Sequence, residues 1–379
     1  MLLDRLGQAR TTVRLVAIAA ALTACGSGST PPRNALRPAR SAATPAASAP
    51  RPAGVAPPAA RVTSPPTLAA VGPAITLSFA GDVHFEGGSR AALSGGLGAI
   101  APALSRADLT MVNLETAVTD RGSPSGGKQF SFRAPAAAFA ALRRAGVDVV
   151  TMANNHGLDY GQVGLADSLA ASRAAGLPVV GAGSDEDAAF AAHLATVRGR
   201  RVAFIGATQV LDDNLAAAWT AGPGKPGLAS AKDQRRLVAA VREARAHADV
   251  VVVDLHWGTE LASCPTTAQR SLAPLLVAAG ADVVLGSHAH VQLGGGWLGR
   301  SYVDYGLGNF VFYARTPPTE QSGVLTLTVR GRAVTAATWS PARIRSGLPV
   351  PLTRSAGRAA RASKDGLRRC TGLAGSPPG

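Results

Sequence analysis

The sequence predicts an α/β protein from residue 74 onward. Apolar, β-branched runs alternate with Ala-, Leu- and Arg-rich segments whose apolar residues recur at helical spacing. The apolar runs are continuous, which is typical of strands buried on both faces of a sheet. Together these two patterns favour a sheet covered by helices on both sides. A chain of 379 residues has room for one large domain or two ordinary ones.

The elements can be placed in chain order. Strands are expected at residues 74–83, 109–115, 147–154, 177–183, 201–208, 248–258, 281–290 and 301–310. Helices fit between them at about residues 98–107, 135–145, 162–175, 230–247 and 266–279. The segment that follows differs, because "GVLTLTVRG" and "AVTAATWS" alternate with a period of two on either side of "RGRA". This pattern predicts an antiparallel hairpin over residues 323–340.

The first 25 residues have the features of an export signal. Three arginines precede the apolar run "LVAIAAAL", which is too short to span a bilayer. The tetrapeptide "LTAC", which ends at Cys25, resembles a bacterial lipobox and implies removal of residues 1–24 and lipidation of the Cys25 thiol. An ordinary secretory peptide cut elsewhere is the alternative. In either case we expect an extracytoplasmic protein, and the lipobox makes it a membrane-anchored lipoprotein.

Most of the net charge of +15 lies in the two tails. Residues 25–73 are rich in Pro, Ala and Ser, hold five arginines and no acid, and are predicted to form a disordered tether. Residues 353–379 carry five arginines and one lysine against one aspartate. Flexible basic arms near a membrane or an acidic polymer fit this charge distribution better than a basic groove built into the fold, so we expect no nucleic-acid partner.

Two cysteines remain outside the lipobox, Cys264 and Cys370. In an oxidising compartment an even pair suggests a disulfide, which would pin the C-terminal tail to the domain. Two unpaired thiols are the alternative.

Five of the seven histidines follow predicted strands, whereas His193 and His247 lie in segments without other site-like residues and are interpreted as surface residues. Two carboxylates and an amide pair occupy matching strand ends. Ligands bind at the carboxyl ends of strands in α/β sheets, so this set is better explained as a binding site than as core packing. Its members are His84, His156, His256, His288, His290, Asp82, Glu115, Asn154 and Asn155.

Imidazole, carboxylate and amide groups suit divalent ions such as Mn, Zn or Fe, and the lack of thiolates argues against a structural zinc site. There are too many such groups for one ion. Two ions that share a bridging carboxylate would use them all. Residues i and i+2 of a strand share a face, so His288 and His290 in "GSHAHV" could each contact one ion of such a pair.

Seven motifs in order carry a family resemblance: "GDVHFEG", "NLE", "FSFRAP", "ANNHGLDYG", "HWGTEL", "GSHAHVQ" and "YGLGNFVF". Over about residues 75–345 the chain resembles the CapA family, linked to poly-γ-glutamate capsule synthesis, within the calcineurin-like metallophosphoesterases. The resemblance implies a domain at 74–352 built as a four-layer sandwich, with two central mixed β-sheets flanked by helices.

The resemblance also implies a ligand set. One ion would be held by Asp82, His84 and His290, the other by Asn155, His256 and His288, with Glu115 bridging and His156 as general acid or phosphate-stabilising donor. This chain departs from the phosphoesterase pattern at two points, because Glu115 replaces the usual Asp and Gly157 follows Asn-His where an acid is usual. Remaining motif residues that could support the ligands or contact substrate are Asn154, Asp159, Arg133, Trp257, Glu260 and Asn309.

For some of these residues the sequence leaves two roles open. Asp159 and Tyr160 could orient His156 or cap the following helix. Trp257 and Glu260 could shape the pocket mouth or support His256. Asn309 could fix a turn or touch substrate, and Arg133 is the one candidate to bind a phosphate.

Two functions remain open at this point. The first is a dinuclear, metal-dependent hydrolase of the phosphoesterase type that acts in capsule, poly-γ-glutamate or other cell-envelope polymer biosynthesis. The second is a non-catalytic accessory protein for synthesis or export of an anionic surface polymer.

Overall fold

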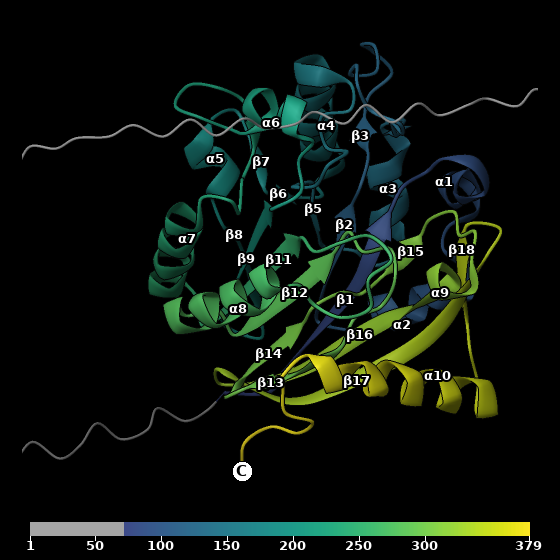
Figure 1. The fold of residues 1–379 in the computed structure, drawn as a ribbon, viewed down its shortest axis with the longest axis vertical. Helices are drawn as coiled ribbons and strands as arrows, with labels where there is room; N and C mark the ends of the chain where they lie inside the picture. Colours follow the sequence, from purple (N-terminus) through teal and green to yellow (C-terminus); the bar gives the residue numbers. More distant parts are fainter. Residues whose placement is uncertain (1–71) are drawn as a thin grey trace, which may run out of the picture. The chain divides into compact units, whose positions relative to one another are not determined.

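The computed structural model describes residues 72–379. The predicted signal peptide, Cys25 and nearly all of the tether lie outside this range. Within it, no helix is both long and apolar enough to cross a membrane. Two large β-sheets face each other and helices cover their outer faces, so the four-layer α/β sandwich expected from the sequence is confirmed (Figure 1).

The first sheet is mixed and has the order β18-β17-β16-β1-β2-β5-β6, with β15 paired to the end of β1. Its parallel part consists of β1 (Ile75–Val83), β2 (Leu109–Leu114), β5 (Val149–Thr151), β6 (Val179–Val180) and β15 (Asn309–Val311). Its antiparallel part contains the predicted hairpin and consists of β16 (Gln321–Arg330), β17 (Ala333–Arg345) and β18 (Leu348–Pro351).

The second sheet is also mixed and has the order β13-β14-β12-β11-β9-β8. The four inner strands are parallel and the two edge strands antiparallel. The strands are β8 (His193–Val197), β9 (Arg200–Thr208), β11 (Val250–His256), β12 (Val283–Ser287), β13 (Gly295–Leu298) and β14 (Ser301–Asp304). Two small pairs lie outside both sheets: β3 (Ala117–Val118) with β4 (Arg133–Ala134), and β7 (Ala182–Gly183) with β10 (Gly227–Leu228).

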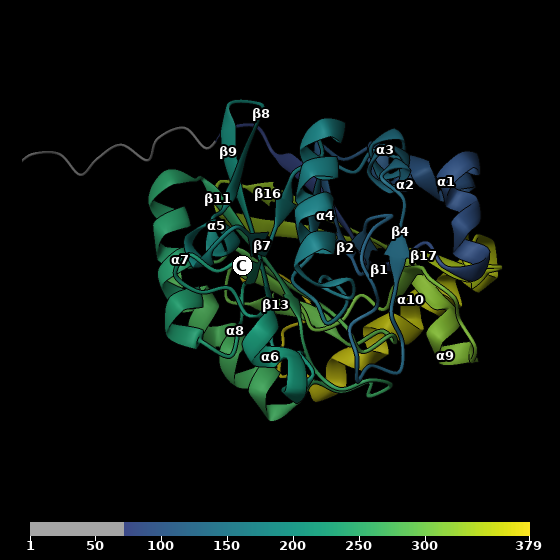
Figure 2. The same ribbon diagram turned by 90° about the horizontal axis from the view of Figure 1, so that it is seen from above.

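Helices pack on the outer face of each sheet, on opposite sides of the sandwich in Figure 2. The first sheet is covered by α2 (Ala101–Ser105), α3 (Ala137–Arg144) and α4 (Gly161–Ala175), and the second by α7 (Gln234–His247) and α8 (Thr267–Ala279). Shorter elements are η1 (Gly87–Ala91), α1 (Ala92–Gly95), η2 (Gly98–Ile100), α5 (Glu186–Phe190), α6 (Asp213–Trp219) and α9 (Pro317–Glu320).

Strand β11 shows why the apolar runs are continuous. Val250 and Val252 pack in the core between the two sheets, whereas Val251 and Val253 pack beneath the helices of the outer layer. Both faces of this stretch are buried, so four apolar residues follow one another, and polar residues enter only at Asp254 and His256 toward the strand end.

Three expectations need correction. The predicted strand 177–183 is split into β6 of the first sheet and β7 of a small pair. The predicted strand 301–310 is split into β14 and β15, which belong to different sheets. The C-terminal tail is not a flexible arm, because it forms α10 (Arg354–Gly366) and η3 (Leu367–Cys370), and α10 packs along β17 (Figure 1). Its lysine, Lys364, is buried in an ion pair with Asp304. A disulfide joins Cys264 to Cys370.

Candidate metal centre

The predicted site residues meet where strands of both sheets end. Asp82 lies near the end of β1, Glu115 directly follows β2, and His256 is the last residue of β11. His288 and His290 follow β12, and the segment 154–156 follows β5. Parallel strands point their carboxyl ends to the same edge, which is why residues far apart in sequence converge here.

Gly81 makes the end of β1 possible. A Cβ atom at this position would lie 1.7 Å from the carbonyl oxygen of Gly308, so no other residue fits. The pairing of β1 with β2 shifts register at this point, and the backbone N–H of Asp82 donates to Gly308 O (3.0 Å). The irregularity aims the Asp82 carboxylate at the site.

The Glu115 carboxylate lies at the centre of the site. It is fully buried, and neither of its oxygens has a hydrogen-bond partner. Its Oε1 lies 3.9 Å from His156 Nε2, 3.7 Å from His256 Nε2 and 3.9 Å from His290 Nε2. A buried charge without a donor is costly in free energy, so this arrangement calls for a cation.

Asp82 is held from two sides. Asn113 Nδ2 donates to its Oδ1 (2.9 Å) and the backbone N–H of His288 donates to its Oδ2 (3.3 Å). His290 Nδ1 lies 3.3 Å from Oδ2. The carboxylate of β1 is thereby tied to the loop after β12.

His288 and His290 do not lie on a strand, although the sequence predicted a strand to residue 290. Strand β12 ends at Ser287, and the two histidines have positive φ angles of 94° and 56°. Such backbone is unfavourable for residues other than Gly and is typical of functional sites. His290 Nδ1 donates to Asn309 Oδ1 (2.9 Å), and its Nε2 faces Glu115. His288 Nδ1 is buried without a partner.

His256 and Asn155 contact each other directly, with 2.8 Å between His256 Nε2 and Asn155 Oδ1. On the other side of the ring, Nδ1 lies 3.0 Å from Ser287 Oγ and 3.2 Å from Asn113 Nδ2. Two ligands of one ion commonly lie about 3 Å apart, so this pair is spaced as co-ligands would be.

His156 forms a chain of contacts that fixes its ring. Its Nδ1 donates to Asp159 Oδ2 (2.6 Å), and Lys128 Nζ pairs with Asp159 Oδ1 at 2.5 Å. Its backbone N–H donates to Asn154 Oδ1 (3.0 Å), and Phe132 packs against the ring with centroids 4.1 Å apart. Of the two roles left open for Asp159, the structure shows it as the partner that orients His156.

The expected role of His84 as a metal ligand stays a prediction. Its Nδ1 lies 3.0 Å from both Glu86 N and Ser89 Oγ, and Tyr313 N lies 3.4 Å from its Nε2. A neutral imidazole accepts a hydrogen bond at only one nitrogen, and the Ser89 hydroxyl, which donates to Glu86 O, can accept a hydrogen bond from Nδ1. The ring packs against Phe312 with centroids 3.8 Å apart, and burial, with the nearby His156 and His290, lowers its pKa to about 3. The ring is therefore neutral, which is the form in which a histidine binds a metal ion.

The donor set fits divalent cations. Two clusters each offer three ligand atoms within 4.8 Å of one another, namely Asp82, Glu115 and His256, and Glu260, His288 and His290. Burial and the charge of Asp82 raise the pKa of Glu115 well above its usual value. Burial alone would lower the pKa of His290, but Glu115 and Asp82 raise it to about 10. Protons on Glu115 and His290 therefore offset the negative charge of the carboxylates, as a bound cation would.

Some of the residues predicted to support the ligands or contact substrate line a cavity at the site, and others do not. Trp257 is fully buried behind the site, where its Nε1 donates to Tyr305 O (3.1 Å), so it does not shape a pocket mouth. Arg133 is exposed and its guanidinium lies over the Tyr160 ring. Glu260 and Asn309, by contrast, line a cavity of about 320 Å³ together with His156 and His290. The arginine of this cavity is Arg315 rather than Arg133.

Two residues at the site were missed by the sequence analysis. Asn113 bridges Asp82, His256 and Asn154, and it precedes Glu115 by two residues in the quoted motif "NLE". This position on β2 was a signal that could have identified it. Lys128 lies in a loop without periodicity, so no sequence pattern marks it.

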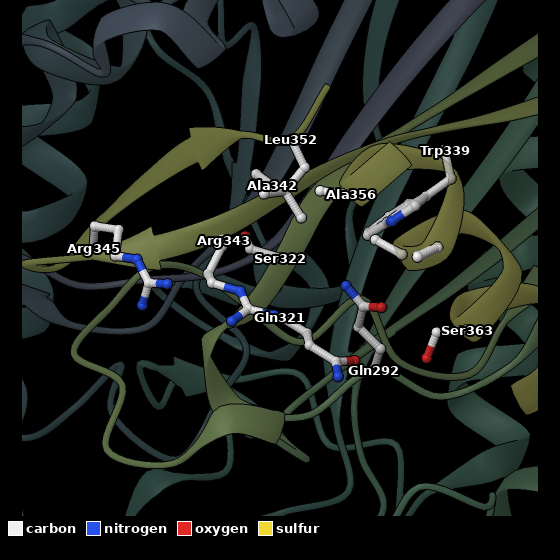
Figure 3. Close-up of a pocket in the computed structure, with 12 residues that line it drawn as sticks. Gln292, Gln321, Ser322, Trp339, Ala342, Arg343, Arg345, Leu352, Ala356 and Ser363 are labelled. Carbon is white, nitrogen blue, oxygen red and sulfur yellow. The ribbon is translucent and has the colours of Figure 1, made fainter. Parts of the chain in front are cut away.

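A separate cavity of about 480 Å³ lies between β16, β17 and α10 (Figure 3). Trp339, Arg343 and Gln292 are among the side chains that line it, and none of the predicted site residues does.

The sequence has relatives in known protein families. The family model described as "Bacterial capsule synthesis protein PGA_cap" matches residues 76–314. "Capsule biosynthesis protein CapA" of Bacillus anthracis is 33% identical over 216 residues, covering 56% of this chain and 52% of that protein. "PGA biosynthesis protein CapA" of Bacillus subtilis (strain 168) is 30% identical over 257 residues, covering 67% and 66%. A "Probable polyglutamine synthesis accessory protein" of Mycobacterium tuberculosis is 31% identical over 189 residues, covering 48% and 50%. The chain thus spans about half to two thirds of the length of these relatives.

Solved structures with a similar arrangement include a hypothetical protein from Thermus thermophilus, 18% identical, with a TM-score of 0.47, covering 72% of this chain and 100% of that chain. A phosphatase from Mycoplasma pneumoniae is 15% identical, with a TM-score of 0.45, covering 71% and 93%. A 5'-nucleotidase from Candida albicans is 14% identical, with a TM-score of 0.43, covering 78% and 57%. Because these TM-scores lie below 0.5, we infer nothing about activity from these structures.

Proposed function

The chain belongs to the bacterial capsule synthesis protein PGA_cap family, and on that premise we propose that it is a metal-dependent hydrolase with phosphoesterase-like chemistry. Its task would lie in the biosynthesis of poly-γ-glutamate or another cell-envelope polymer. The observation that carries the proposal is the buried Glu115 carboxylate, which has no hydrogen-bond donor and faces three imidazole Nε2 atoms at 3.7–3.9 Å.

Six residues would hold two divalent cations of the Mn, Zn or Fe type, with Glu115 between them. The cations would supply positive charge at the scissile bond and make a nucleophilic water available near neutral pH. Asn309 fixes His290 and Asn113 fixes Asp82, which is the support that ligands of a metal site receive from their neighbours. The six residues are Asp82, His84, Asn155, His256, His288 and His290, and Glu260 lies close to His288 and His290.

His156 would move the proton. Its Nδ1–H is held by Asp159, so the Nε2 atom is the one that faces the centre of the site. Burial lowers the pKa of His156, although Asp159 partly offsets the shift. The imidazole is therefore neutral near pH 7, and Nε2 can accept a proton and then pass it to a leaving group.

The alternative is a non-catalytic accessory protein for synthesis or export of an anionic surface polymer. It is supported by the name of the mycobacterial relative. In this alternative the centre would bind cations to hold the fold or a polymer, without turnover.

The proposal extends to location and partners. Cys25 in the lipobox would anchor the protein to the membrane, and the Cys264–Cys370 disulfide suits an oxidising, extracytoplasmic compartment. An anionic envelope polymer or its synthesis machinery would be the partner, and a nucleic acid would not.

Metal content of the purified chain, measured by elemental mass spectrometry, tests the proposal. We expect about two transition-metal ions per chain, their loss in Asp82→Asn/His288→Ala, and their retention in the exposed control His247→Ala. Turnover of phosphomonoesters or phosphodiesters by the metal-loaded chain then separates the hydrolase from the accessory protein. Absence of bound metal after reconstitution with Mn or Zn contradicts the hydrolase.

A further inference from the structure

Exposed apolar side chains gather at the mouth of the cavity beside the metal centre. Among the described residues only five large apolar side chains are exposed. Two of them, Phe130 (45% exposed) and Leu261 (65% exposed), line this one cavity. They come from different layers, because Phe130 precedes β4 of the first half of the fold and Leu261 lies between β11 and α8. Chance would scatter such residues over the surface, so their convergence at one opening calls for an explanation.

Leu261 is exposed at an energetic cost. Its φ angle is 60°, in the left-handed region that a leucine rarely adopts. Its backbone N–H donates to the carbonyl oxygen of Ala289 (2.8 Å), the residue between His288 and His290. A strained backbone that presents an apolar side chain to solvent does not stabilise the fold. Its rigid link to the metal-binding loop points to a role at the site.

Aromatic side chains line the cavity as far as the metal centre. Phe132 packs against His156 with centroids 4.1 Å apart, and Phe312 against His290 with centroids 4.8 Å apart. Tyr313 adjoins Phe312, and the guanidinium of Arg315 lies over the Tyr313 ring at 5.1 Å. Arg315 is the one Lys or Arg side chain among the residues that line the cavity.

We propose that this cavity binds the apolar organic group of the substrate, with Phe130 and Leu261 enclosing it at the mouth. The substrate is then an anionic ester, such as a phosphoester, whose organic part is aromatic or aliphatic rather than a small polar group. The anionic group faces the metal centre, and Arg315 at the rim attracts it. The inference rests on the proposed function, because it places the scissile bond at Glu115 and His156.

The experiment measures binding rather than turnover. Isothermal titration calorimetry on the Mn-reconstituted chain compares three non-hydrolysable anions, namely methylphosphonate, phenylphosphonate and hexylphosphonate. The two rim variants are Phe130→Ser and Leu261→Asn. Asn tolerates the left-handed backbone, so Leu261→Asn removes the apolar contact while it relieves strain, and its thermal midpoint should equal or exceed that of the wild type. The matched control is Leu275→Asn, which removes an exposed leucine (47% exposed) outside the cavity.

We expect phenylphosphonate or hexylphosphonate to bind about five- to tenfold tighter than methylphosphonate, because the larger organic group buries aromatic and apolar surface in the cavity. If phenylphosphonate binds more tightly, the natural organic group is a flat ring. If hexylphosphonate binds more tightly, it is an alkyl chain, such as that of a lipid. The advantage should shrink at least about threefold in each rim variant and persist in Leu275→Asn.

Equal binding of all three anions, or an advantage that survives in both rim variants, overturns the inference and leaves the proposed function intact. Binding of none of them to the metal-loaded chain overturns the proposed function and the inference with it.

Discussion

The C-terminal helix provides a sharp quantitative prediction, through Lys364. Its Nζ is buried and donates to Asp304 Oδ1 (2.9 Å), Leu293 O (2.6 Å) and Gly306 O (3.2 Å). Lys364→Met removes all three donors at once. It leaves the Asp304 carboxylate, whose other oxygen already lacks a partner, buried with only the Gly306 N–H. Removing one partner of a buried ion pair costs about 3–5 kcal/mol of folding free energy.

Chemical denaturation of the disulfide-intact protein measures this loss. Two variants accompany Lys364→Met in the assay. Asp304→Asn in the same chain removes the uncompensated charge and should restore about 2 kcal/mol, because the pair is coupled. Arg358→Met, on the exposed side of α10, is the control and should change stability by less than about 0.5 kcal/mol.

The deficit should also depend on pH. Burial raises the pKa of Asp304 even with Lys364 present, and loss of the ammonium raises it further. An acid whose folded-state pKa lies above the unfolded value is protonated more readily when folded, so it destabilises the fold increasingly as pH rises between the two values. The Lys364→Met deficit should therefore be larger at pH 8 than at pH 5.

A deficit below about 1 kcal/mol at pH 8, or one equal to that of Arg358→Met, would refute this reasoning. The tail would then be the loosely held basic arm that its charge pattern suggested.

Three further predictions concern the site. His84→Gln should lower the metal content of the purified chain, because it removes one of the proposed ligands; wild-type metal content on elemental analysis would remove His84 from the ligand set. His156→Gln should keep its metal and lower turnover by about 10²–10⁴-fold, and unchanged steady-state rates would remove the proton-transfer role. Chelation should lower the thermal midpoint of the wild type and leave Asp82→Asn/His288→Ala unchanged, since ligand binding stabilises only the chain that retains the site; equal shifts would place the stabilising ion elsewhere.

The sequence predicted the layers of the fold because burial leaves a periodic signature. Val250 to Val253 are apolar because both faces of β11 are covered, and this pattern is local. Strand ends are local features too, which is why Asp82, Glu115 and His256 could be identified as neighbours. The pair Lys364–Asp304 is sixty residues apart and has no such signature. Composition therefore suggested a flexible tail where the chain forms a docked helix.

The details of the site depend on backbone conformations that no periodicity reports. The sequence placed His288 and His290 on a strand, where alternate side chains share a face. In the structure they converge on Glu115 and Asp82 through left-handed backbone after the strand has ended. His84 is a further case, because its contacts with Glu86 N and Ser89 Oγ at Nδ1 are local contacts that no periodicity reports.

Backbone strain is concentrated at the metal centre. Of the six non-glycine residues with positive φ in the described part of the chain, three are Leu261, His288 and His290. Each such residue costs about 1–3 kcal/mol and persists only where its surroundings hold it. Hydrogen bonds to Ala289, Asp82 and Asn309 hold these three in turn. Two of those contacts involve the buried Asp82 carboxylate or its histidine partner. The strained loop and the unpartnered Glu115 carboxylate therefore both support the proposed metal site.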